Sequence, residues 1–550
     1  MKGKWLLLAY GLSGVAALAY ELAWMRELST MLGSTAYASG TMLAAYMTGL
    51  GIGAILGVYL VGRTRRPMRM ASRAEIAVAI LSVVAFLGIR YLPGYYFDVM
   101  KSWGLTSGGL FLSLQFAVSF VIMALPTIAM GTTYPLVMRA VNRDKELGTW
   151  SGKLYAVNTL GAIAGSLMAS FVLLPTVGVK GSLVVAAVVS LVAAVIFSAL
   201  ATRDSRVPLF FRSADVASLA VVVIILLIPA RTGSPLGLGQ AFYYRSAADF
   251  ERTASARETI FESEGVYSHV AVVESGDGMR TLHNGALDEG TDNDFDRVTT
   301  TMLALVPAMS VNATDSALIV GLGTGFTSRT YYDLGFGQVT TVEINPDVVP
   351  ASEYFIGPVS DDDPRWDIKI DDARAYILTN PEKYDAITSE PSWPWSSGVA
   401  ALFTQEFMEA AKSRLNDDGV YCQWLPNYIL EPDDVAMMYK TMRQVYDRVD
   451  VWSINFPQDQ NAELLLIGYA DPDGPSMDEV KQRLDARIAA MGGSNPLIAP
   501  QSITPYPQFD ALEAALEDPS VPLNVDDHST LEYRVFWNFV NSALSREGGL

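Results

Sequence analysis

The sequence is poor in the residue types that cross-link chains or bind zinc. Its 550 residues include one cysteine, Cys422, and three histidines, His269, His283 and His528. One cysteine excludes a disulfide within the chain, and no cluster supplies the roughly four nitrogen or sulfur ligands of a zinc site. We therefore expect no metal. Cys422 lies in the apolar run GVYCQWL, which predicts a core position, because buried cysteine behaves as a small hydrophobe.

Charged residues are scarce in the first part of the chain, and their sign changes along it. Residues 1–230 hold 18 Lys/Arg and 8 Asp/Glu, whereas the remaining 320 residues hold 21 and 50. The acidic part repels nucleic acid and attracts cations, so we expect no nucleic-acid partner. Solubility or a salty habitat explains the same acidity equally well.

Apolar segments long enough to cross a bilayer fill residues 1–230. The first is too long, and is followed by too many others, to be a cleaved signal peptide. Small residues in GLGIGAILG and GAIAG predict close packing between helices. We therefore predict a multi-pass transmembrane helical domain. About 20 apolar residues span a bilayer, and the seven candidates are 5–25, 36–61, 74–92, 107–125 (or on to 140), 152–174, 182–201 and 214–230.

Basic residues predict which loops face the cytoplasm. Five arginines lie in 62–73, and 139–153 and 203–206 are also basic, so the positive-inside rule places all three in the cytoplasm. If the chain crosses the inner (plasma) membrane six times, the soluble part lies in the cytoplasm. A seventh span, 214–230, would export that part. Either this segment is re-entrant or interfacial, or one span is miscounted, for example at a break at Pro126.

Two charged residues lie near the end of the first predicted span. Charges inside a membrane are costly and are candidates for function. Glu21 and Arg26 are five residues apart, so they do not face each other on one helix. A partner on another helix, snorkelling to the interface or a substrate path would each explain them.

The acidic part shows the pattern of an α/β protein. Short alternating strands broken by GDG predict a small antiparallel sheet from 255. Helical stretches such as 402–415 separate apolar strands expected at 316–322, 338–344, 366–370, 384–390, 420–425, 449–456 and 462–469. The first five strands should be parallel and the last two an antiparallel edge. The expected domains are 1–230 (transmembrane), 231–298 (linker and small β domain), 299–475 (Rossmann-like, catalytic) and 476–550 (C-terminal helical extension).

A glycine-rich turn follows the first of these strands. Gly321, Gly323 and Gly325 allow backbone amides to approach a ligand at the carboxyl end of the strand. Phe326 stands where a dinucleotide-binding turn needs a small residue, which counts against NAD. Glu343 ends the second strand, where a carboxylate can accept both ribose hydroxyls of a nucleoside.

Two acids follow the third strand. With the glycine turn and Glu343, Asp371 and Asp372 look like a class I S-adenosylmethionine fold, with Asp372 placed to accept from the adenine amino group. Alternatively, either aspartate caps the helix that follows.

The stretch SEPSWPW follows the fourth strand. Glu390 stands at the carboxyl edge, where open sheets place their chemistry. A carboxylate beside Trp393 and Trp395 suits a cationic amine, with cation–π attraction of about 0.5–2 kcal/mol, and Glu390 could remove the proton of that amine. A proline-rich loop packed with tryptophan is the alternative.

These segments resemble the aminopropyltransferases, the family of spermidine synthase. The resemblance lies in VGLGTG, VEINPDVV, DPRWDIKIDDARAYI, YDAITSEPSWPW, LFTQEFMEAAKSRLNDDGV and QWLP. In the first part, YELAWMREL, PTIAMGTTYPLVMR and GKLYAVNTLGAIAGSL resemble the transmembrane part of bacterial spermidine-synthase-like fusions, sometimes described as half of a major-facilitator transporter.

The resemblance implies transfer of an aminopropyl group from decarboxylated S-adenosylmethionine to putrescine or a similar amine, without a metal. It implies that Glu390 is catalytic. It also implies a cofactor-binding set, Gly321, Gly323, Gly325, Glu343, Asp371 and Asp372.

The acceptor side departs from the family pattern. The family's D-G-x-x-Q segment is 284–288 here, its Y-H-E segment is 295–297, and its glutamine after the hairpin tyrosine is Ser268. These departures favour a bulkier, membrane-resident or lipid-linked amine. The candidate acceptor-binding residues are Tyr267, Asp288, Asp296 and Trp393.

Two other functions remain open. One is a methyltransferase that uses ordinary S-adenosylmethionine on a membrane or lipid substrate; the 320–330 turn offers only Arg329 for the carboxylate of that cofactor. The other is a non-catalytic transporter or sensor that binds a polyamine. The expected partners are the lipid bilayer and a polyamine or other amine, and a homodimer is left open.

Overall fold

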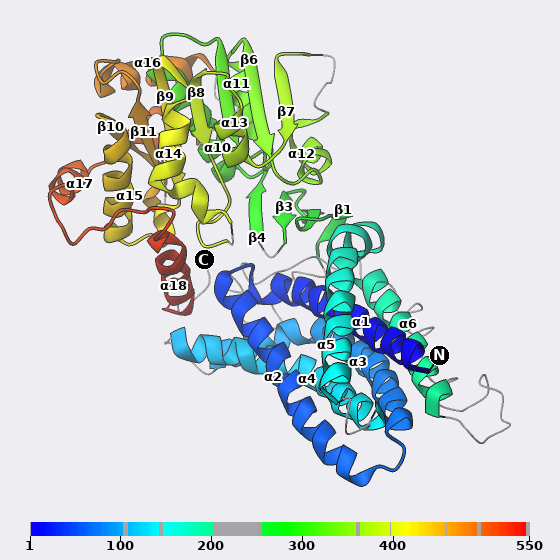
Figure 1. The fold of residues 1–550 in the computed structure, drawn as a ribbon. Coiled ribbons are helices and arrows are strands. Elements are labelled where there is room, and N and C mark those ends of the chain that lie inside the picture. The colour runs from blue at the N-terminus through cyan, green and yellow to red at the C-terminus, as the bar shows by residue number, and fades with distance from the viewer. Residues whose placement is uncertain are drawn as a thin grey trace. The chain divides into compact units, whose positions relative to one another are not determined.

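A computed structural model describes most of the chain. It divides into two compact units, one of N-terminal helices and one of mixed α/β structure, and each is described by itself (Figure 1). The described residues are 2–102, 108–141, 147–201, 252, 256–285, 287–358, 363–396, 398–457, 459–491 and 497–545.

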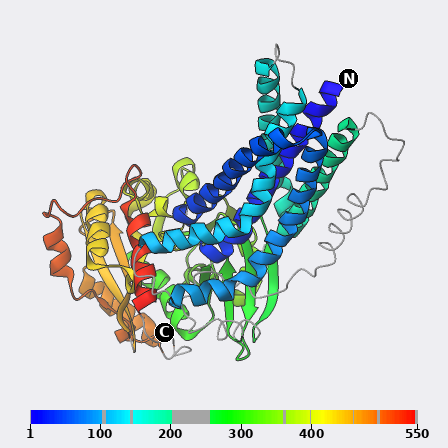
Figure 2. The same cartoon turned by 90° about the horizontal axis from the view of Figure 1, so that it is seen from below.

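The N-terminal unit consists of long apolar helices. α2 packs along α4, α1 packs against α5 and α6, and α3 packs against α4 and α6 (Figures 1 and 2). The backbone leaves the helical region at Gly178, where φ is +67°, so α6 contains a kink. The bounds are α1 Lys2–Leu32, α2 Ala36–Arg63, α3 Pro67–Ser102, α4 Gly108–Val141, α5 Leu147–Met168, a π-helical turn Ala169–Leu173 and α6 Leu174–Ala201.

The described residues contain five helices long and apolar enough to cross a membrane, fewer than the seven predicted spans. Two predicted spans, 152–174 and 182–201, lie within one continuous helical stretch, 148–201. The predicted span 214–230 lies outside the described residues. The break expected at Pro126 is wrong, since α4 continues through Pro126 and Pro135.

Small residues bring these helices close together, as predicted. A Cβ atom added at Gly53 of α2 would lie 2.2 Å from the carbonyl oxygen of Ile128 in α4. One added at Gly161 of α5 would lie 2.1 Å from the carbonyl oxygen of Gly11 in α1. No side chain fits at either distance, so glycine is what permits these two contacts.

The α/β unit is built on an eight-stranded sheet in the order β12-β10-β11-β9-β8-β5-β6-β7 (Figure 1). The five strands β5 to β9 pair in parallel, as predicted. β11 pairs antiparallel with β9 and β10, and β12, not predicted, covers β10 at the edge. The bounds are β5 Ser316–Val320, β6 Gln338–Glu343, β7 Trp366–Ile370, β8 Tyr384–Ser389, β9 Leu415–Leu425, β10 Val449–Phe456, β11 Asp459–Tyr469 and β12 Ile503–Pro505.

Helices cover both faces of this sheet, so its central strands are buried on both sides. α10 contacts α11 and α16, while α14 contacts α13 and α15. Every residue of β8 is buried, and burial of one large aliphatic side chain contributes about 1.5–3 kcal/mol. The helices are α10 Asp294–Ser310, α11 Phe326–Asp333, α12 Val348–Ile356, α13 Ala373–Thr379, α14 Gln405–Lys412, α15 Pro432–Val445, α16 Met477–Ala490, α17 Phe509–Ala515 and α18 Thr530–Ser545, with 3-10 turns Ala400–Phe403, Asn427–Ile429 and Pro500–Ser502.

Two expectations about helices need correction. The helix predicted at 402–415 is shorter, because Ala400–Phe403 is a 3-10 turn and Leu415 already belongs to β9. The extension 476–550 is not only helical, because it also supplies β12 to the sheet.

A small antiparallel sheet precedes α10, in the order β1-β2-β3-β4. The sequence indicated three of its strands but not β4. A Cβ atom added at Gly290 of β4 would lie 3.1 Å from Cγ2 of Thr324 in the glycine turn. The small sheet therefore reaches the turn that follows β5. The bounds are β1 Glu258–Glu264, β2 His269–Glu274, β3 Arg280–Asn284 and β4 Leu287–Thr291.

Candidate active site

The predicted glycine turn joins β5 to α11 at the carboxyl edge of the sheet. Gly321, Gly323 and Gly325 have φ values of +92°, +52° and +81°, which other residues rarely adopt. A Cβ atom added at Gly321 would lie 3.0 Å from the carbonyl oxygen of Glu390. The turn thus lies directly against the end of β8.

Glu343 is held against this turn by hydrogen bonds. The backbone N–H groups of Leu322 and Asn345 donate to its two carboxylate oxygens at 2.9 and 2.8 Å. The side chain is 7% exposed, and burial raises the pKa of Glu343 although these backbone bonds oppose the rise. Each carboxylate oxygen has a second acceptor site, so the group retains capacity for two hydroxyl donors.

The two aspartates after β7 are exposed. The carboxylate of Asp372 accepts from the N–H of Ala375 at 2.9 Å and caps α13, so the capping interpretation is confirmed for this residue. Asp371 accepts from the N–H of Asp372 at 2.8 Å. Ile344 and Ile370, which follow Glu343 and precede Asp371, are 42% and 50% exposed. An aromatic base would contact exposed apolar side chains such as these two, and it would donate to a carboxylate oxygen of an exposed aspartate.

The capping and base-binding roles of Asp372 can be separated by mutation. In Asp372→Asn, the new amide would still cap α13 but would present an N–H donor to an adenine amino group. For this variant we expect unchanged thermal stability and a KM for the nucleoside donor raised about tenfold, the loss of one hydrogen bond. Asp372→Ala should lose stability as well, by about 1 kcal/mol. Equal donor KM values for Asp372→Asn and the parent would leave the cap as its only role.

Glu390 lies at the end of β8. By exposed surface Glu390 is only partly buried. The hydroxyl of Thr327, in α11, donates to its Oε2 at 2.6 Å and also lies 3.2 Å from the carbonyl oxygen of Thr300. Desolvation raises the pKa of Glu390 to about 7, and the negative charges of Glu463 and Asp296 add to the rise. A carboxyl with this pKa can accept a proton near neutral pH.

Two carboxyl groups that the sequence did not single out share this environment. The hydroxyl of Ser392 donates to Glu289 of β4 at 2.5 Å, and the indole N–H of Trp424 donates to Glu463 of β11 at 3.2 Å. Burial raises the pKa of each to about 7. The charge of Glu289 acts on Glu390 as well. We call Glu289, Asp296, Glu390 and Glu463 the acidic cluster.

The predicted acceptor residue Asp296 belongs to this cluster, and Asp288 lies beside it. Asp296 accepts from the N–H and the hydroxyl of Thr291 at 2.7 and 2.6 Å, and burial raises its pKa. Asp288 lies 2.6 Å from Nδ1 of buried His283, and its charge raises the pKa of Glu289. None of the four cluster carboxylates forms a salt bridge with a basic side chain of the described residues.

The remaining predicted acceptor residues are aromatic. Trp393 stacks obliquely on Trp395 at 4.7 Å and meets Tyr428 edge-on at 5.9 Å, so the SEPSWPW loop forms an aromatic wall. Tyr267 is 54% exposed. It precedes Ser268, which accepts from the side-chain amide of Asn345 at 2.8 Å, and so it lies on the glycine-turn side of the site. Cys422 is buried, as predicted.

Comparisons with known proteins agree on one family. Residues 297–466 match the model of the spermine/spermidine synthase domain. A polyamine aminopropyltransferase of Corynebacterium efficiens is 26% identical over 430 residues, 76% of each chain. One of Mycobacterium tuberculosis is 26% identical over 474 residues, 82% of this chain and 83% of that protein. The crystal structure of spermidine synthase from Thermotoga maritima aligns with a TM-score of 0.37 and 19% identity, over 48% of this chain and 85% of that one.

Proposed function

Because the chain is a transferase of the aminopropyltransferase family, with a spermine/spermidine synthase domain at 297–466, we propose that it transfers an aminopropyl group from decarboxylated S-adenosylmethionine to a multiply charged amine. The acidic cluster supports this proposal most directly. Four partly buried carboxyls without a basic partner among the described residues stand beside the glycine turn, and such a site favours a cationic ligand or protons.

In this proposal the donor occupies the carboxyl edge of β5 to β7. Its ribose hydroxyls donate to Glu343, and its adenine lies by Ile344 and Ile370 with its amino group toward Asp372. The glycine turn allows the sugar to approach the backbone. The acceptor occupies the acidic cluster beside Trp393, whose ring face attracts an ammonium group.

The reaction is a single displacement. The lone pair of the acceptor nitrogen attacks the carbon next to the sulfonium. The carbon–sulfur bond breaks, and its electron pair stays on sulfur, which leaves as neutral methylthioadenosine. Glu390 accepts the proton that the attacking nitrogen loses. The protein contributes mainly by holding nitrogen and carbon close and in line.

The acceptor in this proposal carries at least two amino groups. Glu390 is used by the attacking nitrogen, so Glu289, Asp296 and Glu463 remain to neutralise ammonium groups elsewhere on the acceptor. A singly charged lipid amine would leave most of these carboxylates unpaired, which is costly for partly buried charges. A diamine or triamine therefore fits better than the lipid-linked amine that the sequence alone favoured.

We also propose that the N-terminal unit embeds the enzyme in the plasma membrane, with the α/β unit in the cytoplasm, where the donor is made. Five apolar helices of sufficient length support the membrane location.

The function is tested by product analysis on the full chain in detergent. With decarboxylated S-adenosylmethionine and putrescine or spermidine, we expect methylthioadenosine and the aminopropylated amine in equal amounts. With ordinary S-adenosylmethionine we expect no S-adenosylhomocysteine. Formation of S-adenosylhomocysteine would favour the methyltransferase, and amine binding without product would favour the transporter or sensor.

A further inference from the structure

A line of polar side chains runs along one face of α1 inside the helical unit. Ser13, Ala17, Tyr20 and Trp24 are spaced three or four residues apart, and Glu21 is adjacent, so they share this face. Tyr20, Glu21 and Trp24 are buried, with exposures of 0%, 4% and 0%. Among apolar helices, a buried polar line is costly and indicates a function.

Neighbouring helices add polar groups to this line. At one end, Glu75 of α3 is 2% exposed and accepts from the hydroxyl of Ser13 at 2.6 Å and of Thr133 in α4 at 3.4 Å. One turn further along α1, the hydroxyl of Tyr46 in α2 donates to the carbonyl oxygen of Ala17 at 3.1 Å. One more turn leads to Glu21.

The line contains polar atoms without a hydrogen-bond partner among the described residues. Oε2 of Glu21 and Nε1 of Trp24 are fully enclosed and unbonded. Neither Glu21 nor Glu75 forms a salt bridge with a basic side chain of that part of the chain. An enclosed carboxyl without a cation must stay neutral, and no hydrogen bond to Oε2 of Glu21 compensates for its burial.

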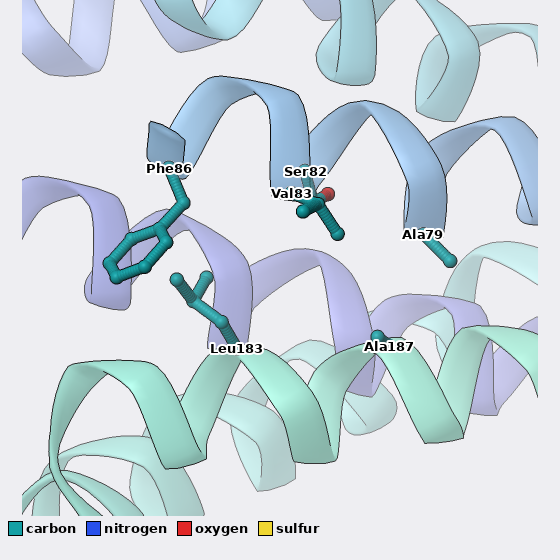
Figure 3. Close-up of a pocket in the computed structure, with 6 residues that line it drawn as sticks. All are labelled: Ala79, Ser82, Val83, Phe86, Leu183 and Ala187. Carbon is teal, nitrogen blue, oxygen red and sulfur yellow. The ribbon is translucent and has the colours of Figure 1, made fainter. Parts of the chain in front are cut away.

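Mostly apolar side chains of α3 and α6 flank the line. A narrow pocket lies between α3 and α6, and the hydroxyl of Ser82 is the polar group in its lining (Figure 3). Ser82 and Ser190 lie beside the hydroxyl of Tyr20. The pocket is otherwise lined by Ala79, Val83, Phe86, Leu183 and Ala187.

We propose that the helical unit binds a linear polyamine, with one ammonium group at Glu21 and another at Glu75. Positions 13 and 21 of α1 are about 12 Å apart at 1.5 Å per residue, so one ammonium group cannot serve both carboxylates. The rings of Tyr20 and Trp24 stack at 5.3 Å beside Glu21 and offer their faces to a cation.

This site is separate from the acidic cluster and does not depend on the proposed reaction. A divalent metal is a poor alternative, because calcium takes six to eight oxygen ligands and the two carboxylates stand at opposite ends of the line. An amine lipid headgroup supplies one ammonium group and leaves the other carboxylate unpaired.

The proposal is tested by equilibrium binding of radiolabelled spermidine to the full chain in phosphatidylcholine nanodiscs. Glu21→Gln and Glu75→Gln should each bind one spermidine fewer than the parent, because removal of one partner from a buried charge pair weakens affinity at least about thirtyfold. Aminopropyl transfer to soluble spermidine should stay within twofold of the parent. Glu27→Gln, the same change six residues further along α1, should bind like the parent.

The experiment compares the number of spermidine molecules bound per chain in the variant and in the parent. The expected difference of one molecule does not depend on whether the catalytic site also binds spermidine. Glu21→Gln is the safer variant, because Oε2 of Glu21 has no hydrogen bond to lose among the described residues; gel filtration checks its folding. A second measurement is the infrared carboxylic-acid band assigned to Glu21, which should disappear when spermidine binds. The proposal would be overturned if Glu21→Gln bound as many spermidine molecules as the parent, or if the band persisted with spermidine. Either result would show that the carboxyl groups of Glu21 and Glu75 stay protonated and bind no ammonium group.

Discussion

Replacement of Glu390 by glutamine is expected to lower kcat for aminopropyl transfer by about 10²–10⁴, the usual contribution of a positioned base. The amide keeps the size of the side chain and can still accept from Thr327, but it cannot take the proton of the attacking nitrogen. Binding of the nucleoside donor, measured by calorimetry, should not change, because Glu390 belongs to the acceptor side. Glu382→Gln is the matched control, since Glu382 is exposed just before the opposite end of β8.

The pH profile of the parent checks the same role. Burial raises the pKa of Glu390 to about 7, so the ionised base predominates above that pH and the protonated form below it. We expect kcat/KM to rise with pH through about 7 and this limb to vanish in Glu390→Gln. Full activity of Glu390→Gln at neutral pH would remove Glu390 from the mechanism.

Replacement of Glu343 by glutamine should weaken donor binding about a hundredfold. Its carboxylate accepts from the N–H groups of Leu322 and Asn345, and the proposal adds two ribose hydroxyls. An amide offers one oxygen, and its NH₂ group meets a backbone donor, so about two charge-assisted hydrogen bonds worth about 1.5 kcal/mol each are lost. The Kd for decarboxylated S-adenosylmethionine measures the effect.

The control for Glu343→Gln is Asp333→Asn, an exposed change at the far end of α11. The control should bind the donor like the parent. Gly321→Ala tests the geometry of the same region, because its Cβ atom would lie 3.0 Å from the backbone of Glu390. Donor affinity in Glu343→Gln that matches the control would place the ribose elsewhere.

The central sheet was predictable because its strands are continuous apolar runs that end at turns. β7 and β10 coincide with the predicted 366–370 and 449–456, and the parallel order followed from the helices between strands. β12 could not be predicted, because three residues in a proline-rich stretch have no periodicity. β4 has polar residues and a glycine, so it too lacks an apolar alternation.

The donor side of the site was more predictable than the acceptor side for a physical reason. Gly321, Glu343 and Asp371 each lie at the end of a parallel strand, and such ends meet at one edge of a sheet. Glu289 and Glu463 come from antiparallel strands, and only tertiary packing brings their charges near Glu390. One local signal was present, since Glu463 is the only charge in the apolar run AELLLIGY.

Thr327 has one hydroxyl hydrogen and two oxygen acceptors within reach, the carboxylate of Glu390 and the carbonyl of Thr300. While Glu390 is an anion, the hydrogen points to it. Once Glu390 is protonated, its own O–H can donate to Thr327, whose hydrogen then turns to Thr300. The hydrogen bond between Thr327 and Glu390 is therefore kept in both charge states, and rotation about the C–O bond of Thr327 reverses its direction.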